Sequence, residues 1–397
     1  MTRCDTLIIG AGVMGLAIAR EIKQRFPNAS ITIIEKEDHV AEHASGRNSG
    51  VLHAGFYYSA DSLKAKFCRD GNAAWKAYAK AHGLRLNECG KVVIARNEHE
   101  QQMIHELKRR GDANGVMLQV IDAQQLADLE PNARTHKQAI FAPSTAVVDP
   151  GEVCAHLAEK LIRSGVTLLT SHPYRGKLDH HTVLAGDKRI EAGKIINCAG
   201  VYADKIAQDF GFAQRYTIIP FKGIYLVWQG AGQPVKRCVY GVPNLTNPFL
   251  GVHFGVRVDG ATRLGPTSIP AFWRENYQGM EHFNLQEMLA ISGWEMKLFL
   301  TNAFNFRALA FAEMRKYIRG HMASLAGQMV QHVDMRHFSR WDRPGIRAQL
   351  LNTETSELVM DFVVEGDTNS VHVLNAVSPA FTCALPFATW VVEKYVI

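Results

Sequence analysis

The residues just before the turn signal Asp259–Gly260 combine an imidazole and a guanidinium at strand spacing. Side chains of a strand alternate between its two faces. One face then holds Gly251, His253, Gly255 and Arg257, and the other holds Leu250, Val252, Phe254 and Val256. Imidazole exchanges protons near neutral pH, and a guanidinium fork binds carboxylates. The pattern predicts an acid–base site for a carboxylate ligand, with a solvent-facing strand edge as the alternative interpretation.

A second histidine, His53, lies in a stretch rich in glycine, serine and asparagine, residues 44–58. Backbone amides in such a segment can face a ligand. His53 and His253 are therefore our two candidates for a catalytic base, and a structural role is the alternative for each.

The N-terminal residues carry a G-x-G-x-x-G pattern formed by Gly10, Gly12 and Gly15, after an apolar run and before an apolar helical stripe. Gly10 permits a tight turn, Gly12 lets a pyrophosphate approach the backbone, and Gly15 lets the helix pack on the strands. Glu35 ends the next β-rich run, where it would accept hydrogen bonds from a ribose and repel a 2′-phosphate. The spacing predicts a βαβ dinucleotide fold, with a glycine turn in another α/β protein as the alternative.

Periodicity predicts the elements that position these groups. Helices are expected at residues 73–82, 98–110 and 153–163, strands at 166–169, 218–228 and 250–263, and a largely helical stretch at 284–329 with a break at 302–305. Pro386 is expected to end or kink a helix unless it lies in the first turn.

Composition bounds the class of protein. The chain has 397 residues, enough for two or three domains, and a net charge of +6 without a dense basic block, which argues against a nucleic-acid partner. Its seven cysteines form no C-x-x-C pair, which indicates a reducing, cytoplasmic setting. We expect no metal site, no G-x-S-x-G hydrolase and no transmembrane helix at residues 368–392.

Several motifs along the chain resemble the L-2-hydroxyglutarate dehydrogenase/oxidase branch of the D-amino-acid-oxidase-like FAD family. The matching segments follow the expected order: S-G-R-N-S-G-V-L-H-A-G-F-Y-Y from Ser45, S-L-K-A-K-F-C from Ser62, and residues 196–204, 220–225, 242–243, 249–254, 264–266, 345–349 and 375–380. The sequence departs from that branch at Arg47, where histidine is usual, and at Val377, Phe381, Cys383 and Pro386, where a smaller and more polar run is expected.

The resemblance implies an α/β fold with an α+β substrate part. A Rossmann-like FAD-binding domain would comprise residues 1–75, 142–215 and 340–397. A mixed-sheet substrate domain, interleaved with it, would comprise residues 76–141 and 216–339.

The resemblance also implies roles for particular residues. His53 and His253 would be catalytic, and Arg257, Arg274, Arg347, Lys222 and Tyr225 would bind substrate. FAD would be bound by Gly10, Gly12, Gly15, Glu35, Lys36, Arg47, Asn48, Ser49, Gly50, Cys198, Ala199, Gly200, Ser378 and Pro379.

The activity implied by the resemblance is FAD-dependent oxidation of L-2-hydroxyglutarate, or a close 2-hydroxy acid, to the 2-oxo acid, by hydride transfer to flavin N5. Electrons would pass to oxygen or a quinone. The alternatives are an FAD amine or amino acid oxidase acting on glycine or sarcosine, a flavin-binding protein without turnover, and a nicotinamide dehydrogenase. We expect a cytoplasmic protein. Residues 281–330 mix aromatic and basic side chains, which indicates either peripheral contact with the inner face of a membrane or with a quinone, or simply core residues with a basic solvated face.

Overall fold

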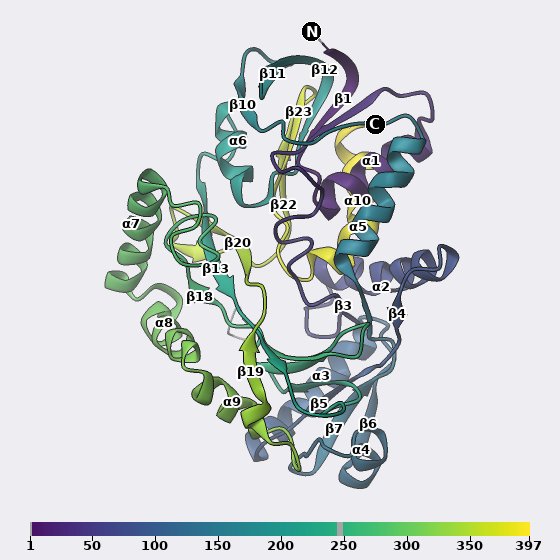
Figure 1. Ribbon diagram of the computed structural model, residues 1–397, viewed down its shortest axis with the longest axis vertical. Helices are drawn as coiled ribbons and strands as arrows, with labels where there is room; N and C mark the ends of the chain where they lie inside the picture. Colours follow the sequence, from purple (N-terminus) through teal and green to yellow (C-terminus); the bar gives the residue numbers. More distant parts are fainter. Residues whose placement is uncertain (1, 244–248) are drawn as a thin grey trace.

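Figure 1 shows the chain as a computed structural model that describes residues 2–243 and 249–397. The helices are α1 (Val13–Arg25), α2 (Leu63–Ala81), α3 (Glu98–Ala113), α4 (Ala123–Leu129), α5 (Pro150–Arg163), α6 (Ala203–Asp209), α7 (Leu285–Thr301), α8 (Phe306–Met314), α9 (Arg319–Gly327) and α10 (Ala380–Tyr395), with 3-10 turns η1 (Gly200–Tyr202), η2 (Ala303–Asn305), η3 (Arg315–Tyr317) and η4 (Met335–His337). Each of the three helices expected between residues 73 and 163 is present, and α2 begins ten residues before its expected start, at its N-cap Ser62.

The strands belong to four sheets. They are β1 (Thr2–Ile9), β2 (Ile31–Ile34), β3 (Val51–Leu52), β4 (Leu86–Asn87), β5 (Lys91–Ile94), β6 (Gln119–Asp122), β7 (Gln138–Ala142), β8 (Ala146–Val148), β9 (Thr167–Leu169), β10 (Tyr174–Lys177), β11 (Thr182–Ala185), β12 (Lys188–Asn197), β13 (Tyr216–Gly223), β14 (Leu226–Trp228), β15 (Cys238–Gly241), β16 (His253–Val256), β17 (Thr262–Gly265), β18 (Ile269–Pro270), β19 (Phe338–Trp341), β20 (Gly345–Asn352), β21 (Glu357–Leu358), β22 (Val363–Gly366) and β23 (Ser370–Asn375).

Strand β1 lies at the centre of the first sheet, which has the order β10-β11-β12-β1-β2-β9, with β23 and β22 joined beside β12. Ile8 of β1 lies opposite Ile33 of β2 and Ile196 of β12, and both pairings are parallel. Ile8 packs on the side of α1, α5 and α10, whereas its neighbours Leu7 and Ile9 pack on the side of α6. Successive side chains of β1 are thus buried on opposite faces of the sheet, which is typical of a parallel sheet with helices on both faces. The predicted α/β, Rossmann-like fold class is therefore confirmed.

The helix α10 does not end at Pro386 but continues through it, so of the two expected effects of this proline only a kink stays a prediction. Proline has no amide hydrogen, so the Thr382 carbonyl loses its intrahelical donor. Gly71 of α2 packs directly against that carbonyl, where an added Cβ would lie 1.9 Å from the oxygen. At the preceding residue, Phe381, the backbone carbonyl accepts a hydrogen bond from Trp75 Nε1 at 2.8 Å. Close packing of α2 thus stabilises the helix at its proline.

The second large sheet has the order β19-β14-β17-β16-β15-β5-β7-β6. The predicted turn at Asp259–Gly260 connects β16 to β17, and Arg257 N donates to the Ala261 carbonyl at 2.8 Å. The strand before it is shorter than expected, since β16 begins only at His253. Phe254 and Val256 enter the apolar core on one face, as their alternation predicts. His253 faces the opposite side.

The single strand predicted at residues 218–228 is wrong, because the structure divides it into β13 and β14, which belong to different sheets. Residues 224 and 225 cross between the two sheets. There Ile224 N donates to Thr267 Oγ1 at 3.1 Å, and this local bond replaces the bond of a continuous ladder. The crossing leaves Tyr225 between the sheets, at the wall of the cavity described below.

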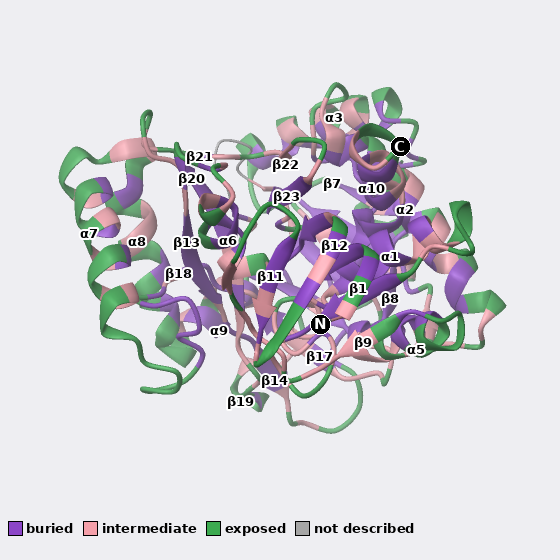
Figure 2. Cartoon of the chain, turned by 90° about the horizontal axis from the view of Figure 1, so that it is seen from above, coloured by how far each residue is buried: buried purple, intermediate pink, exposed green. Residues whose placement is uncertain are grey.

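The helical stretch at residues 284–329 is confirmed, and so is its break. Asn302, Phe304 and Asn305 all have positive φ, which an α-helix excludes. The break lets α7 and α8 lie against each other at one edge of the molecule (Figures 1 and 2). Among the described residues, no helix has the length and apolar character that crossing a membrane requires.

The assignment of segments to two interleaved domains stays a prediction. Strand β13, from the predicted substrate domain, pairs over its whole length with β20, from the predicted FAD domain. These two strands form the centre of a small sheet, β18-β13-β20-β21, that connects the two large sheets.

Candidate active site

A cavity of about 690 Å³ extends from the glycine turn after β1 to the second large sheet. Its walls come from the carboxyl ends of β1, β2 and β12, from the loop at residues 41–49, and from the segment at residues 373–382. The far end is lined by side chains of the second sheet and its connections, which are Tyr225, Tyr240 and His253. Ligands of open α/β sheets bind at this carboxyl edge of the strands. The cavity is thus long, with a cradle of backbone at one end and polar side chains at the other.

The glycine turn has no room for side chains. Gly10 has a φ of +104°, and a Cβ there would lie 2.6 Å from the Cys198 carbonyl oxygen. A Cβ at Gly12 would lie 2.9 Å from Ser45 Oγ, which accepts a hydrogen bond from Val13 N at 2.9 Å, while Gly12 itself supplies no side-chain cap to the start of α1. The amides at this helix terminus therefore favour a phosphate in the cavity. Gly15 lies outside the cavity, where an added Cβ would lie 2.0 Å from the Gly10 carbonyl, so it permits the helix to pack on the strand.

Glu35 lies at the end of β2 and lines the cavity. Its carboxylate accepts hydrogen bonds from Ala11 N at 2.8 Å and from Glu37 N at 3.0 Å. These two bonds fix the carboxylate and leave further lone pairs for ligand hydroxyls. Glycine turn, helix terminus and fixed acid together fit a dinucleotide such as the predicted FAD.

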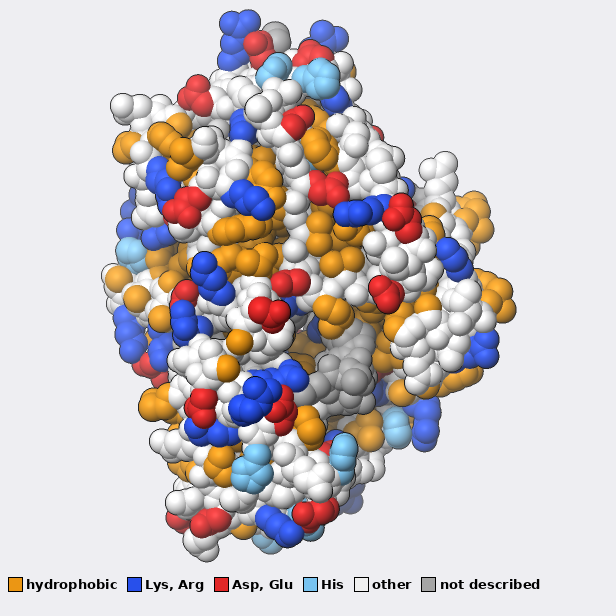
Figure 3. Space-filling view, turned by 180° about the vertical axis from the view of Figure 1, so that it is seen from behind, with side chains coloured by type: hydrophobic (Ala, Val, Ile, Leu, Met, Phe, Trp, Pro, Cys, Tyr) orange, Lys and Arg blue, Asp and Glu red, His pale blue; other side chains and the backbone are white. Residues whose placement is uncertain are grey.

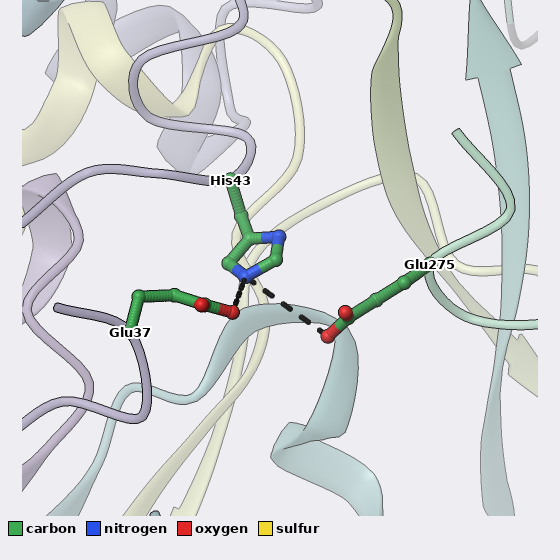
Figure 4. Close-up of side chains that lie close together, drawn as sticks. All are labelled: Glu37, His43 and Glu275. Atoms are coloured by element: carbon green, nitrogen blue, oxygen red, sulfur yellow. Dashed lines mark hydrogen bonds and ion pairs between the residues drawn. The ribbon is translucent and has the colours of Figure 1, made fainter. Parts of the chain in front are cut away.

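An ion-pair cluster lies beside Glu35 (Figure 4). His43 Nε2 lies 2.8 Å from a carboxylate oxygen of Glu37 and 3.9 Å from one of Glu275. Lys36 contacts both carboxylates, Glu275 at 2.7 Å. The sequence predicted no metal site, and among the described residues this cluster is the one group whose spacing could suit a cation. The Lys36 ammonium occupies the space between the two carboxylates, so we interpret the cluster as an ion-pair network that joins the cavity loop to residue 275.

The loop at residues 44–50 contributes unevenly to the cavity. Arg47, Asn48 and Ser49 line it, whereas Gly50 does not. The Arg47 guanidinium is already engaged, because Nε donates to the Glu42 carbonyl at 2.7 Å and the group lies 4.0 Å from the centre of the Tyr277 ring. Burial alone would raise the pKa of Glu42, but hydrogen bonds from Arg343, Arg47 and His39 lower it to about 2. Arg47 thus orders the loop as well as facing the cavity.

The remaining residues predicted to hold the cofactor also line the cavity. They are Lys36, Cys198, Ala199, Gly200, Ser378 and Pro379. They follow β2, β12 and β23. These strands are parallel in the first sheet, where β12 pairs with β23 and β1 lies between β12 and β2, so the residues meet at one edge.

Both candidate histidines line the far end of the cavity. His253 Nδ1 lies 2.8 Å from the Gly251 carbonyl oxygen. Because a carbonyl only accepts, Nδ1 carries the proton and Nε2 keeps its lone pair. Burial lowers the pKa of His253 to about 3, an effect that the bond to Gly251 opposes and the charges of Lys91, Lys316 and Arg347 add to. Its imidazole is therefore neutral at working pH, which a proton acceptor requires.

His53 is held through its backbone, whose amide donates to Thr382 Oγ1 at 3.1 Å. Burial lowers the pKa of His53 well below its usual value, and the charges of Lys91, His253 and Arg347 lower it further. The two imidazoles thus share one electrostatic environment, although they are 200 residues apart in sequence.

Arg347 and Tyr225 reach the same end of the cavity. Within residues 2–243 and 249–397, the Arg347 guanidinium has no acidic partner, and its contact is the Phe249 ring, 4.9 Å from its centre. Burial lowers the pKa of Arg347, and it raises the pKa of Tyr225. A buried guanidinium without a carboxylate is unfavourable in the empty protein, so it indicates a site for an anion.

The other cations predicted to bind substrate do not line the cavity. Arg274 makes a bidentate ion pair with the fully buried Asp204, at 2.7 and 2.8 Å. Arg257, at the β16–β17 turn, lies 3.3 Å from Asp259. Lys222 points to Asn276 at 3.4 Å. Each of these three has a local partner that the sequence pattern did not reveal.

Two residues of this region were missed by sequence reasoning. Tyr240 lies on β15 and stacks on the imidazole of His253. Lys91 begins β5 and is fully buried beside Tyr240. A lysine at the start of the apolar run K-V-V-I was the available signal, but its burial depends on β7 and β15, which pair on either side.

Comparisons with known proteins agree with this geometry. A family model described as FAD dependent oxidoreductase (DAO) matches residues 5–394. The chain is 32% identical to the L-2-hydroxyglutarate dehydrogenase of Escherichia coli strain K12, covering 98% of this chain and 92% of that protein. It is also 32% identical to the mitochondrial L-2-hydroxyglutarate dehydrogenase of Homo sapiens, with 98% and 88% covered.

Two solved structures share the fold. The L-alpha-glycerophosphate oxidase from Mycoplasma pneumoniae, with FAD bound, has a TM-score of 0.76 at 22% identity, covering 99% of this chain and 94% of that one. The glycine oxidase from Geobacillus kaustophilus has a TM-score of 0.72 at 17% identity, covering 100% and 96%.

Proposed function

The chain belongs to the DAO family of FAD-dependent oxidoreductases, and we propose that it oxidises L-2-hydroxyglutarate to 2-oxoglutarate. Family membership confirms the predicted cofactor, FAD, and the predicted enzyme class. The relatives at 32% identity carry the name of this activity over nearly the whole chain. The single structural observation that supports the substrate is Arg347, a buried guanidinium without an acidic partner among the described residues, beside two neutral imidazoles.

The reaction removes a hydride from the carbon that bears the hydroxyl and a proton from its oxygen. Bound FAD supplies the acceptor for the hydride. The residues of the chain bind and orient the substrate and take the proton. We assign the proton to His253 Nε2, because Nδ1 already donates to the Gly251 carbonyl. Arg347 would hold a substrate carboxylate with its planar fork, which restricts the substrate to one orientation.

The cofactor residues divide by the part of FAD that they suit. Gly10, Gly12 and the start of α1 would hold the pyrophosphate, and Glu35 the ribose of the adenosine half. Cys198, Ala199, Ser378 and Pro379 would line the path toward the histidines.

The alternative is an FAD-dependent amine or amino acid oxidase, which the shared fold with a glycine oxidase leaves open. An amine or amino acid substrate carries an ammonium group at neutral pH, and the positive charges of Arg347 and Lys91 would oppose binding of this cation at the end of the cavity. A 2-hydroxy acid brings no positive charge to this environment, which is why we favour it. Anaerobic reduction of the bound flavin by L-2-hydroxyglutarate, compared with sarcosine and glycine, tests the choice directly.

The proposed oxidation would also require a final electron acceptor, either oxygen or a quinone. The exposed surface of α7 and α8 favours the interpretation that the electron acceptor lies at a membrane. Apolar side chains are exposed along one stripe, namely Leu285, Leu289, Met296 and Leu300 on α7, and Phe311, Met314 and Ile318 in and after α8. Figure 3 shows hydrophobic side chains next to Lys and Arg side chains along this edge.

The charges on the same surface match an anionic lipid layer. Between residues 285 and 319 the exposed charged side chains are Lys297, Arg307, Arg315 and Arg319, and all are basic. The acids of the stretch, Glu287, Glu295 and Glu313, are half-buried or buried. Apolar anchors beside basic residues are typical of helices that lie on a membrane surface.

Sedimentation of the holoenzyme with lipid vesicles tests this contact. We expect binding to vesicles that contain an anionic lipid, little binding to neutral vesicles, and loss of binding in Leu289→Glu/Leu300→Glu. Met117→Glu changes an exposed apolar residue between α3 and β6, outside α7 and α8, and should bind like the parent. Equal binding by the parent and by the double variant would exclude α7 as the contact.

A further inference from the structure

Lys91 is the first residue of β5 and has no exposed surface. Its backbone is fixed in the middle of the second sheet, opposite Cys238 of β15 and Ala142 of β7. Lysine is rarely buried unless its ammonium has a partner. Here Nζ has no hydrogen-bond partner in the part of the chain that the structure describes.

Three aromatic rings surround the ammonium. Nζ lies 4.9 Å from the ring centre of Phe56, 4.7 Å from that of Tyr57 and 4.7 Å from that of Tyr240. Rings at this distance attract a cation through their π faces. The phenol oxygens of Tyr57 and Tyr240 are themselves without hydrogen-bond partners. The three rings therefore form an aromatic box that holds the charge but does not neutralise it.

The groups that face Lys91 include no carboxylate, and a hydrogen bond from Cys89 lowers the pKa of Cys238. They are the thiols of Cys68, Cys89 and Cys238, the phenols of Tyr57 and Tyr240, and the imidazoles of His53 and His253. No aspartate or glutamate contributes to its electrostatic environment. Burial accordingly lowers the pKa of Lys91 to about 8.

The box is connected to the cavity through one ring. Tyr240 contacts Lys91 on one side and stacks on His253 on the other, and both Tyr240 and His253 line the cavity. Lys91 lies directly behind this wall, and its charge acts on both His53 and His253. The charge of the buried Glu313 also acts on Arg347, but Glu313 is paired with the buried Lys316, so Arg347 and Lys91 remain as two buried positive charges without an ion-pair partner of their own among the described residues.

We propose that Lys91 makes the cavity specific for a dianion. Its ammonium, inside the aromatic box, offsets the second negative charge of a dicarboxylate. The Lys91 amine takes up a proton when that ligand binds. Arg347 contacts the ligand directly, whereas Lys91 acts on it electrostatically from behind the ring of Tyr240. The inference rests on the proposed function, since it explains why a hydroxy acid with two carboxylates would be preferred over one with a single carboxylate. A monoanion would leave one of the two charges uncompensated.

Calorimetric titration of the holoenzyme with glutarate tests the proposal without turnover. Glutarate is a dicarboxylate that lacks the 2-hydroxyl group and therefore cannot be oxidised to the 2-oxo acid. At pH 8.5 Lys91 is partly neutral in the free protein, and the dianion restores its charge. Measured in buffers of different ionisation enthalpy, binding should draw in about half a proton. Both imidazoles are neutral at this pH, and comparison with variants of Lys91 and of Lys64 separates Lys91 from the other groups that titrate near pH 8.5.

Lys91→Met should bind glutarate about tenfold more weakly at pH 7 and take up no proton at pH 8.5, while butyrate binding changes little. Lys64→Met is the matched control, because Lys64 is also buried with a pKa lowered to about 8, but the nearby Asp361 opposes that shift. It should keep the proton uptake.

The outcomes separate the two proposals. Unchanged proton uptake in Lys91→Met, or loss of uptake in Lys64→Met instead, would overturn the role of Lys91 and leave the proposed substrate in place. Failure of the parent holoenzyme to bind glutarate at all would overturn both.

Discussion

The imidazole of His253 stacks on the phenol ring of Tyr240, with ring centres 3.6 Å apart and planes 20° apart. The Gly251 carbonyl holds Nδ1 of the same imidazole at 2.8 Å. These two contacts fix both the plane and the tautomer of the ring, so that Nε2 is its available base. His53 has no comparable bond to its imidazole among the described residues. This difference is our reason for assigning the proton to His253.

Replacing His253 by asparagine should therefore lower the rate of flavin reduction by about 10²- to 10⁴-fold at saturating substrate, the usual contribution of a positioned base. His53→Asn should lower it less and act mainly on substrate binding. Stopped-flow absorbance of the flavin band, recorded over a range of substrate concentrations, gives both the rate constant of flavin reduction and the apparent Kd of the substrate. A larger loss of rate in His53→Asn than in His253→Asn would reverse the assignment.

Arg347→Gln should lower kcat/KM for L-2-hydroxyglutarate by about 10- to 100-fold, because one charge-assisted hydrogen-bond pair to a carboxylate is lost. Most of the loss should appear in KM. Arg257→Gln is the matched control, since Arg257 pairs with Asp259 and does not line the cavity. Equal effects of the two substitutions in steady-state assays would show that Arg347 does not bind the substrate.

The outcome for the arginines shows where sequence reasoning reaches its limit. The glycine fingerprint, Glu35, His53 and His253 could be predicted, because local spacing and motif order determine which strand end they follow. Arg274 and Arg257 could not be separated from Arg347, because only tertiary structure reveals that Asp204 and Asp259 are their partners. Most elements were predictable in type from periodicity.

Three features depended on contacts remote in sequence. The division of residues 218–228 into β13 and β14 follows from pairing with β20 and β17. The passage of α10 through Pro386 follows from packing against Gly71. The burial of Lys91 follows from β7 and β15 on either side of its strand. Periodicity is judged over short stretches of sequence, and each of these partners lies outside the stretch that it affects.

Gly10→Ala should weaken FAD binding by about 10- to 100-fold, because a strained turn residue costs on the order of 1–3 kcal/mol. The added Cβ would lie 2.6 Å from the Cys198 carbonyl oxygen, in a backbone with a φ of +104°. Gly83→Ala is the control, since Gly83 has a φ of +64° but open space around it. The ratio of flavin to protein absorbance after purification and dialysis reports the result. Full flavin content in Gly10→Ala would argue against the cradle.

Lys91→Met should stabilise the protein at pH 7 by about 2 kcal/mol, because it removes a buried, unpaired charge. The folded pKa of about 8 lies below the ordinary 10.5. Between these values the unfolded chain holds the proton more tightly, so the cost is complete below pH 8 and disappears as the pH rises toward 10.5. The difference in Tm between variant and parent should thus be largest at pH 7 and smaller at pH 9.5. A variant less stable than the parent at pH 7 would contradict this account.

The most direct test of the central proposal is anaerobic mixing of the purified, FAD-containing protein with L-2-hydroxyglutarate, its D-isomer and sarcosine, while the visible flavin band is recorded. We expect L-2-hydroxyglutarate to bleach the band and the other two to leave it unchanged. Bleaching by sarcosine in place of the hydroxy acid, or no bleaching by any of the three, would contradict the proposed activity.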